Sequence, residues 1–384
     1  MAMATLAVAE IGGSPRERGR QHGRQLKALV RERDRRWRAE IESSLSMPSD
    51  RFIGQFLAET RFVAAIERHA PDLLDEVRGI AEGADLSYDA VLAAQFMDEE
   101  WWYSLGLKQC QSGESAHHCS GLASLKPGGG ALLAQNMDLA RWTDGLQTLL
   151  LIRDAAPGLD AYVLTMAGMI GLCGVNSAGL GLTVNTLGDL TSATDGLPVA
   201  FVSRSLLTQS GYDEAAHFLG RIRHASGQNY ILSDGRQLGD FECSTDHATA
   251  FAPTGAAPGC VWHTNHALAN RDLIPPSKSE AAERFHRNTR RRMSALDRRL
   301  EGRAAPFDQT VAREALTSQD DPESPISVTA ANADRRKSGF FTFASVIWEI
   351  GSEIAALVAP GAPSDFDYQG FRLARRSPVR AVAE

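Results

Sequence analysis

The sequence predicts an α+β fold in which a helical N-terminal segment precedes a larger region of paired strands and grouped helices. Residues 14–105 contain helix-capping sequences and are rich in Arg, Gln, Lys and Leu, which favour helices. From residue 119 onward, short apolar runs alternate with glycine and asparagine turns, which is typical of strands. No internal repeat or low-complexity segment interrupts this order. A helical part followed by strand pairs and grouped helices predicts a layered α+β protein.

The first helix is predicted by Ser14 and Pro15, an N-cap residue followed by proline at the first helical position. A second helix boundary falls at Pro71, and residues 86–89 form another capping sequence. We expect N-terminal helices over 15–44, 52–69, 71–83 and 86–103.

The strands of the second region are predicted from short apolar runs, and the turn over 176–179 is typical of a hairpin. We expect strands near 119–125, 131–137, 149–152, 161–166, 170–175, 181–186, 229–233, 238–243, 248–251, 340–349 and 354–359. We expect helices over 198–209, 212–224, 279–303 and 307–318.

Composition limits the classes of partner. The chain has 384 residues, 43% of them hydrophobic and 23% charged, which is enough for a sizeable globular core. The net charge of −7 disfavours nucleic acid or an anionic membrane as the main partner. The apolar stretch 340–359 is interrupted by Glu349, Gly351 and Glu353, so it predicts two strands and a turn rather than a membrane span.

The cysteine pattern indicates a reducing compartment. Five cysteines are too few and too scattered for a disulfide framework, and their odd number leaves at least one free thiol. The N-terminus lacks the basic and apolar regions of a secretory signal. We therefore expect a cytoplasmic protein.

Cys119 is the most informative of these cysteines. A glycine turn over 126–130 joins the strand that begins at Cys119 to a second strand, which we expect to end at Asp138. A hairpin centred near Gly128 places Cys119 opposite Met137 or Asp138, so a thiol lies beside a carboxylate. The alternatives are an inert buried thiol and a carboxylate that only caps a strand.

The order and spacing of several short motifs resemble the autoproteolytic acyltransferases and amidohydrolases related to isopenicillin-N acyltransferase, which are N-terminal-nucleophile hydrolases. The motifs lie at 13–19 with Gly23, 69–83, Cys119, 135–138, 174–180, 264–266 and 360–363. The resemblance runs over most of the chain. It implies a four-layer αββα sandwich and a precursor that cuts itself before the cysteine, giving an α chain of 1–118 and a β chain of 119–384 in one compact unit.

Carried over by motif, the resemblance implies that Cys119 is the nucleophile and that Asp138 and Asn265 support it. The self-cleaved bond is then His118–Cys119. Glycine is common before the cysteine in this family and threonine after it, whereas this chain has His118 and Ser120. We expect His118, in place of glycine, to alter the rate of self-cleavage. Asn265 is alternatively a loop residue that satisfies backbone groups.

These residue types fit thiol chemistry. A free thiol has a pKa of about 8.5 and an α-amino group about 7.7–8.0, so an N-terminal cysteine carries its own base. The amide of Asn265 is expected to stabilise the oxyanion, a contribution typically worth about 2.7–4 kcal/mol. Residues expected to contact the substrate are Asn136, His266 and Arg284, although structural roles remain open for them.

Two other interpretations are weaker. The sequence His117-His118-Cys119 with Cys110 resembles a zinc site, but adjacent side chains diverge and no Cys-x-x-Cys pair supports it. The arginines between residues 284 and 303 would suit an acidic partner, yet a solvated helix explains them better. We expect no metal and no other cofactor.

The sequence therefore predicts a self-processing amidohydrolase that cleaves a small N-acylated or amide-linked amine through a thioester. One alternative is acyl transfer from a thioester or amide to an amine in secondary metabolism. Another is an unprocessed, inactive relative that only binds. The expected partners are a small amide or acyl substrate and the two chains of the same precursor.

Overall fold

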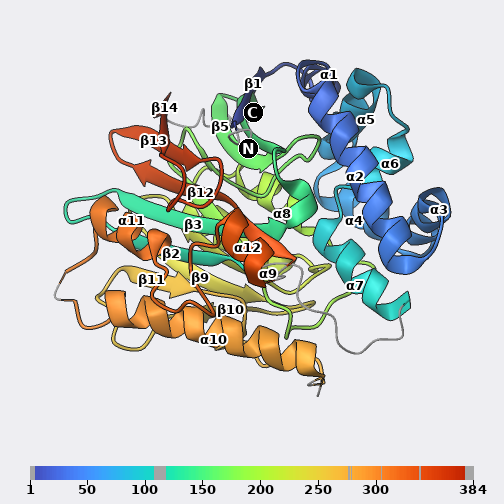
Figure 1. The fold of residues 1–384 in the computed structure, drawn as a ribbon. Helices are drawn as coiled ribbons and strands as arrows, with labels where there is room; N and C mark the ends of the chain where they lie inside the picture. The colour runs from blue at the N-terminus through green and yellow to red at the C-terminus, as the bar shows by residue number, and fades with distance from the viewer. Residues whose placement is uncertain are drawn as a thin grey trace.

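The chain forms two stacked β-sheets with helices on both outer faces (Figure 1). The computed structural model describes residues 5–107, 118–275, 277, 279–303, 305–336 and 339–376. Strands of one sheet contact strands of the other, as β3 (Ala131–Ala140) does with β7 (Gly181–Thr186). This arrangement confirms the predicted α+β class and the four-layer αββα order.

The N-terminal helices gather on one side of the molecule (Figure 1). They are α1 (Pro15–Gln25), α2 (Lys27–Leu45), α3 (Ser49–Glu59), α4 (Phe62–His69), α5 (Pro71–Ala84), α6 (Tyr88–Ala93) and α7 (Met97–Leu107). Ser14 caps α1 by accepting a hydrogen bond from the Glu17 amide, as its sequence predicts. The expected helices over 15–44, 52–69 and 86–103 are each divided in two.

Helices α1 and α5 are in close contact because glycines line their crossing. A Cβ atom on Gly19 would overlap the carbonyl oxygen of Glu76, and one on Gly79 would overlap that of Arg16. Only residues without side chains allow the two backbones to come this near. The glycines at 19, 23, 79 and 83, which belong to the motifs noted in the sequence, therefore have a packing role.

The first sheet has eight strands in the order β1-β4-β5-β6-β7-β8-β9-β10. Their bounds are β1 (Ala7–Ile11), β4 (Gln147–Ala156), β5 (Leu159–Met166), β6 (Cys173–Asn176), β7, β8 (Gln228–Ser233), β9 (Leu238–Cys243) and β10 (Ala248–Phe251). Strand β1, which the sequence did not predict, pairs in parallel with β4. The N-terminal segment thus contributes a strand to this sheet as well as helices.

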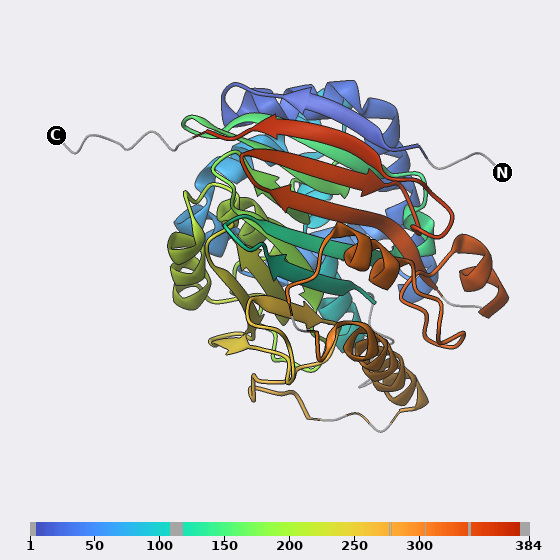
Figure 2. The same ribbon diagram turned by 90° about the vertical axis from the view of Figure 1, so that its left-hand side faces the viewer.

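The second sheet has six strands in the order β11-β2-β3-β12-β13-β14. The remaining bounds are β2 (Ser120–Leu125), β11 (Cys260–His263), β12 (Phe340–Ile350), β13 (Glu353–Ala359) and β14 (Gln369–Ala374). In Figure 2 the C-terminal strands, in red, lie beside the teal hairpin of β2 and β3. The predicted pair of strands within 340–359 is confirmed, with a turn at Gly351.

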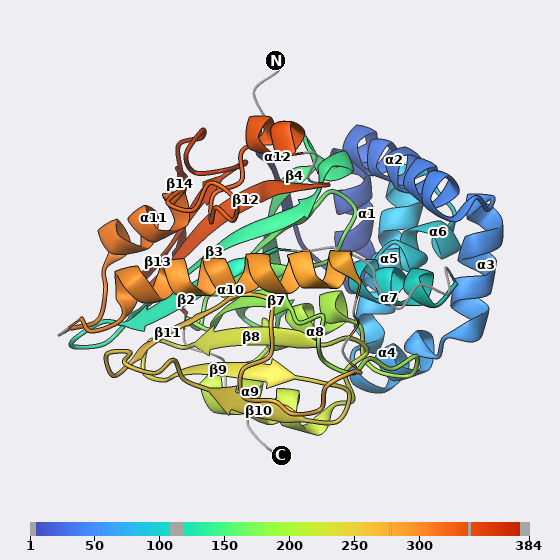
Figure 3. The same cartoon turned by 60° about the horizontal axis from the view of Figure 1, so that its bottom comes forward.

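The remaining helices cover the outer faces of the two sheets. Helices α8 (Val199–Leu206) and α9 (Tyr212–Arg221) contact β7 and β8. On the other side, α10 (Glu280–Leu300), α11 (Gln309–Thr317) and α12 (Ala330–Arg336) cover the six-stranded sheet (Figure 3). Leu122, Leu132 and Trp262 of this sheet share a hydrophobic cluster with Met293 and Leu296 of α10. This cluster packs α10 against β2, β3 and β11.

Strand β3 is longer than predicted. It continues past Asp138 to Ala140, because β12 extends alongside it and pairs Phe340 with Ala140. The prediction that the strand ends at Asp138 is therefore wrong. Asp138 lies opposite Thr342, next to an irregularity in the register of β12.

Candidate active site

Cys119 immediately precedes β2 and is buried, with 4% of its surface exposed. The β2–β3 ladder runs from Ser120 opposite Asn136 to Leu125 opposite Ala131. Extending this register by one residue places Cys119 opposite Met137. The register derived from the glycine turn is therefore confirmed.

Burial raises the pKa of the Cys119 thiol to about 12, and the negative charge of Asp138 adds to this effect. A hydrogen bond with the Asp138 backbone and the positive charge of Arg292 act in the opposite direction. In the uncut chain the thiol is thus protonated at neutral pH. A thiolate nucleophile here therefore requires a base that takes the thiol proton.

Arg292 of α10 is the residue that connects the parts of the site. Its Nη1 donates hydrogen bonds to the carbonyl oxygen of Cys119 at 2.6 Å and to Ser120 Oγ at 3.0 Å. Its Nη2 donates to Asn265 Oδ1 at 2.8 Å, and its Nε to Asn288 Oδ1 at 2.9 Å. One rigid guanidinium fork therefore fixes the backbone of the cysteine and the amide of Asn265 at the same time.

Arg292 is fully buried, which lowers the pKa of its guanidinium to about 10, while the charge of Asp138 acts to raise it. The side chain is therefore still cationic at neutral pH. Asp138 is buried as well. Because isolated buried charges are costly, the opposite charges of Arg292 and Asp138 stabilise each other across the site.

The side-chain amide of Asn265 is held from two sides. Its Nδ2 donates to the carbonyl oxygen of Thr186 at 2.9 Å, and its Oδ1 accepts from Arg292. The Asn265 backbone N–H donates to Thr289 Oγ1 on α10 at 2.8 Å. An Nδ2 group has two hydrogens, so one remains for a further acceptor.

His118 lies between two aromatic rings. Its ring centroid is 5.0 Å from that of Phe340 in β12 and 6.0 Å from that of Phe285 in α10. The bond that joins His118 to Cys119 is thus flanked by α10 and by the six-stranded sheet. Glycine, which is common at this position in the related family, has no side chain to make these aromatic contacts.

Asn136 and His266, both expected to contact substrate, make buried structural contacts. Asn136 Nδ2 donates to the carbonyl oxygens of Leu316 at 2.8 Å and Ile326 at 2.9 Å. His266 Nδ1 lies 3.0 Å from Thr289 Oγ1, and burial lowers its pKa to about 3. Neutral His266 therefore helps to join the Asn265 loop to α10.

Arg284, the third residue expected to contact substrate, is half-exposed and forms an ion pair with Glu280 at 3.1 Å. The inward-facing arginine of α10 is instead Arg292, which the sequence reasoning missed. A signal was present, because Phe285, Thr289, Arg292 and Leu296 recur at helical spacing on the buried side of the helix.

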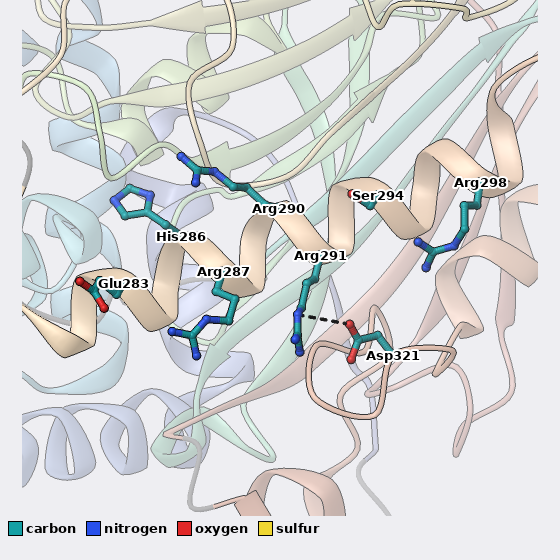
Figure 4. Close-up of a pocket in the computed structure, with 8 residues that line it drawn as sticks. All are labelled: Glu283, His286, Arg287, Arg290, Arg291, Ser294, Arg298 and Asp321. Carbon is teal, nitrogen blue, oxygen red and sulfur yellow. Dashed lines mark ion pairs between the residues drawn. The ribbon is translucent and has the colours of Figure 1, made fainter.

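The outer side of α10 lines an open pocket of about 530 Å³ (Figure 4). Arg291 forms ion pairs there with Asp321 at 3.8 Å and with Glu323 at 3.1 Å. The other arginines that line it are Arg287, Arg290 and Arg298. This face is distinct from the buried side that carries Arg292.

Within the described ranges, no group of three or more His, Cys, Asp or Glu side chains is placed to hold a metal ion. Cys110 and His117, which the zinc interpretation requires, lie outside those ranges. Cys119, Cys173, Cys243 and Cys260 are buried free thiols. In the same part of the chain, no helix has both the length and the apolar character needed to cross a membrane.

Comparison with known proteins adds a family match. Residues 125–359 match the family described as acyl-coenzyme A:6-aminopenicillanic acid acyl-transferase. The chain is 24% identical over 368 residues to the 40 kDa form of acyl-coenzyme A:6-aminopenicillanic-acid-acyltransferase from Emericella nidulans, and the alignment covers 92% of each protein.

The solved structures that match are less similar to this chain. A variant of conjugated bile acid hydrolase from Clostridium perfringens matches with 12% identity and a TM-score of 0.39, over 69% of this chain and 100% of the other. Penicillin V acylase from Agrobacterium tumefaciens matches with 14% identity and a TM-score of 0.32, over 63% of this chain and 83% of the other.

Proposed function

The chain belongs to the acyl-coenzyme A:6-aminopenicillanic acid acyl-transferase family, and from that premise we propose that it is a self-processing amidohydrolase with Cys119 as its nucleophile. Its substrate is a small N-acylated or amide-linked amine. The observation that carries the proposal is the fork of Arg292, which holds the Cys119 carbonyl and the Asn265 amide together. The fork thereby holds the backbone of the thiol residue next to the amide donor, and the charge of Asp138 acts on both Cys119 and Arg292.

Self-cleavage comes first in this proposal. The Cys119 thiol attacks the carbonyl carbon of His118, the C–N bond breaks, and the thiol proton passes to the departing nitrogen. Water then hydrolyses the resulting thioester, which releases the His118 carboxylate and regenerates the thiol. The nitrogen of Cys119 is thereby freed as a neutral amine, and the charge of Asp138 stabilises the α-ammonium group that forms when this amine takes up a proton.

The freed amine then acts as the base for amide cleavage. It takes the thiol proton, and sulfur attacks the substrate carbonyl carbon. The remaining hydrogen of Asn265 Nδ2 stabilises the oxyanion. The substrate nitrogen departs as an amine with the proton, and water hydrolyses the thioester to a carboxylic acid.

Cleavage would give chains of 1–118 and 119–384, and contacts between these two parts support their remaining together. Strand β1 pairs along its length with β4. Arg204 of α8 donates to Glu76 of α5 at 2.9 Å, and both side chains are buried. Four buried free thiols are compatible with the reducing cytoplasm that we propose as its location.

Acyl transfer is the second candidate, and the name of the family and of the fungal relative favours it. In that case an amine replaces water as the acceptor of the thioester. Incubation with an acyl-coenzyme A and an acceptor amine separates the two reactions. A new amide would support transfer, whereas cleavage of simple amides without a new amide would exclude it.

The proposal is tested by intact-mass analysis of the purified protein beside Cys119→Ala and, as a matched buried thiol, Cys260→Ala. Wild type and Cys260→Ala are expected to give two fragments, the larger beginning at Cys119, and to cleave amides. Cys119→Ala is expected to remain one inactive chain. An uncut and inactive wild type would refute the proposal and leave the unprocessed, inactive relative as the alternative.

A further inference from the structure

Asp98 of α7 is a buried carboxylate, 3% exposed, at the ends of β7 and β8. Its Oδ2 accepts a hydrogen bond from Thr186 Oγ1 at 2.7 Å and another from Gln228 Nε2 at 2.5 Å. Thr186 and Gln228 are directly opposite each other in the β7–β8 ladder. One carboxylate oxygen thus joins the last residue of β7 to the first residue of β8.

Thr186 connects this carboxylate to the candidate active site through hydrogen bonds. Its carbonyl oxygen accepts the hydrogen bond from Asn265 Nδ2 at 2.9 Å, while Arg292 holds Asn265 Oδ1 from the other side. The direction of the Asn265 amide therefore depends on where Thr186 is held. Asp98 is the side chain that fixes Thr186 through its hydroxyl group.

We propose that Asp98 is a positioning residue that sets the oxyanion-stabilising amide of Asn265 through Thr186. The proposal rests on the proposed function. Stabilisation of a transition state requires a donor held to within about 0.5 Å of its productive place. Hydrogen bonds to an ionised acceptor are shorter and roughly twice as strong as neutral ones, which suits a carboxylate for that purpose.

The contact also joins the two parts of the chain. Asp98 precedes the proposed cleavage point, whereas Thr186, Gln228 and Asn265 follow it. The negative charge of Asp98 acts on Cys119 as well, although it is the smallest of the named influences on the pKa of that thiol. The N-terminal part therefore contributes directly to the arrangement of the site.

Glu99 provides a matched control on the same helix, because it is equally buried, with 2% exposure. Its Oε1 accepts hydrogen bonds from Ser226 Oγ at 2.7 Å and from the Val199 backbone N–H at 3.0 Å. Neither partner contacts Asn265. Glu99→Ala removes a buried carboxylate from α7 but leaves the contact of Asp98 with Thr186.

The first experiment compares kcat and KM of processed wild type, Asp98→Ala, Asp98→Asn and Glu99→Ala. Asp98→Ala is expected to lower kcat by about 100-fold with KM little changed, because a misplaced catalytic group costs about that factor. Asp98→Asn keeps an oxygen acceptor but loses the charge, so it is expected to recover only part of kcat. Equal kcat values for Asp98→Ala and Glu99→Ala would overturn the proposal.

A second measurement does not depend on turnover. Urea unfolding of Asp98→Ala, Asn265→Ala and the double variant is expected to show non-additive effects. Coupling between Glu99→Ala and Asn265→Ala should be smaller, because the hydrogen bonds of Glu99 connect it to Asp98 indirectly, through Ser226 and Gln228. If Asp98→Ala does not fold, Thr186→Val replaces it, since valine removes the hydroxyl and keeps the shape. Additivity would overturn the inference, while an uncut, inactive wild type would overturn only the proposed function.

Discussion

Arg292 Nη1 lies 2.6 Å from the carbonyl oxygen of Cys119, so a residue of α10 holds the backbone of the cysteine at the start of β2. The guanidinium is completely buried and close enough to Asp138 for the carboxylate charge to raise its pKa. Because the same fork binds Asn265, the position of α10 controls the nucleophile and the amide donor together.

Arg292→Lys is expected to lower kcat by about 100-fold, because an ammonium group keeps the charge but cannot make the bidentate contacts. Its thermal midpoint should also fall, because buried acceptors on Cys119 and Asn265 lose their hydrogen bonds. Arg292→Met should reduce stability further, by about 3–5 kcal/mol, since it also removes the buried positive charge that acts on Asp138. Steady-state kinetics and thermal unfolding measure the two effects separately.

Arg284→Met is the control for that series, since Arg284 lies on the same helix and pairs with Glu280 at the surface. We expect its kcat and KM to match those of wild type. A large rise in KM for Arg284→Met would instead support the substrate contact expected from the sequence. Unchanged kinetics in Arg292→Lys would refute the positioning role of the fork.

The glycine crossing of α1 and α5 predicts a strong steric effect. Gly79→Ala places a methyl group on the carbonyl oxygen of Arg16, and overpacking of this kind typically costs about 1–3 kcal/mol or more. Gly54→Ala in α3 is the control, because a Cβ there would meet nothing within 4 Å. It should be neutral or stabilising by up to about 1 kcal/mol. Urea unfolding of both variants checks the difference, and equal midpoints would contradict it.

His22 predicts a pH dependence of stability. Its Nε2 accepts a hydrogen bond from the Gly168 backbone N–H at 3.0 Å, and burial, with the charges of Arg204 and Arg33, lowers its pKa to about 3. Below the unfolded pKa of about 6.5 only the unfolded chain binds the proton, so falling pH favours unfolding. This contribution is fully present above pH 6.5 and is lost progressively towards pH 3.

His22→Gln keeps an acceptor but cannot titrate. Relative to this variant, wild type should lose about 1.4 kcal/mol of unfolding free energy per pH unit below about pH 6. Urea unfolding at several pH values between 7 and 4.5 measures the difference. Parallel pH profiles for the two proteins would show that His22 does not titrate in this way.

The sequence by itself determined the features that depend on neighbours in the chain. The glycine turn after Lys126 sets the register of the β2–β3 hairpin, because a short turn leaves few ways to pair the strands. Ser14 and Pro15 specify the start of α1 through local hydrogen bonding and a fixed backbone angle. The alternation of apolar runs likewise located β7 and β10 at their observed bounds.

Only the tertiary structure decided the features that depend on distant segments. Strand β3 extends to Ala140 because β12 lies beside it, and Arg292 rather than Arg284 faces Cys119 because of the side on which α10 packs. The link from Asp98 to Thr186 joins residues far apart in the sequence. Such pairings are selected by burial and long-range hydrogen bonding, which local propensities do not encode.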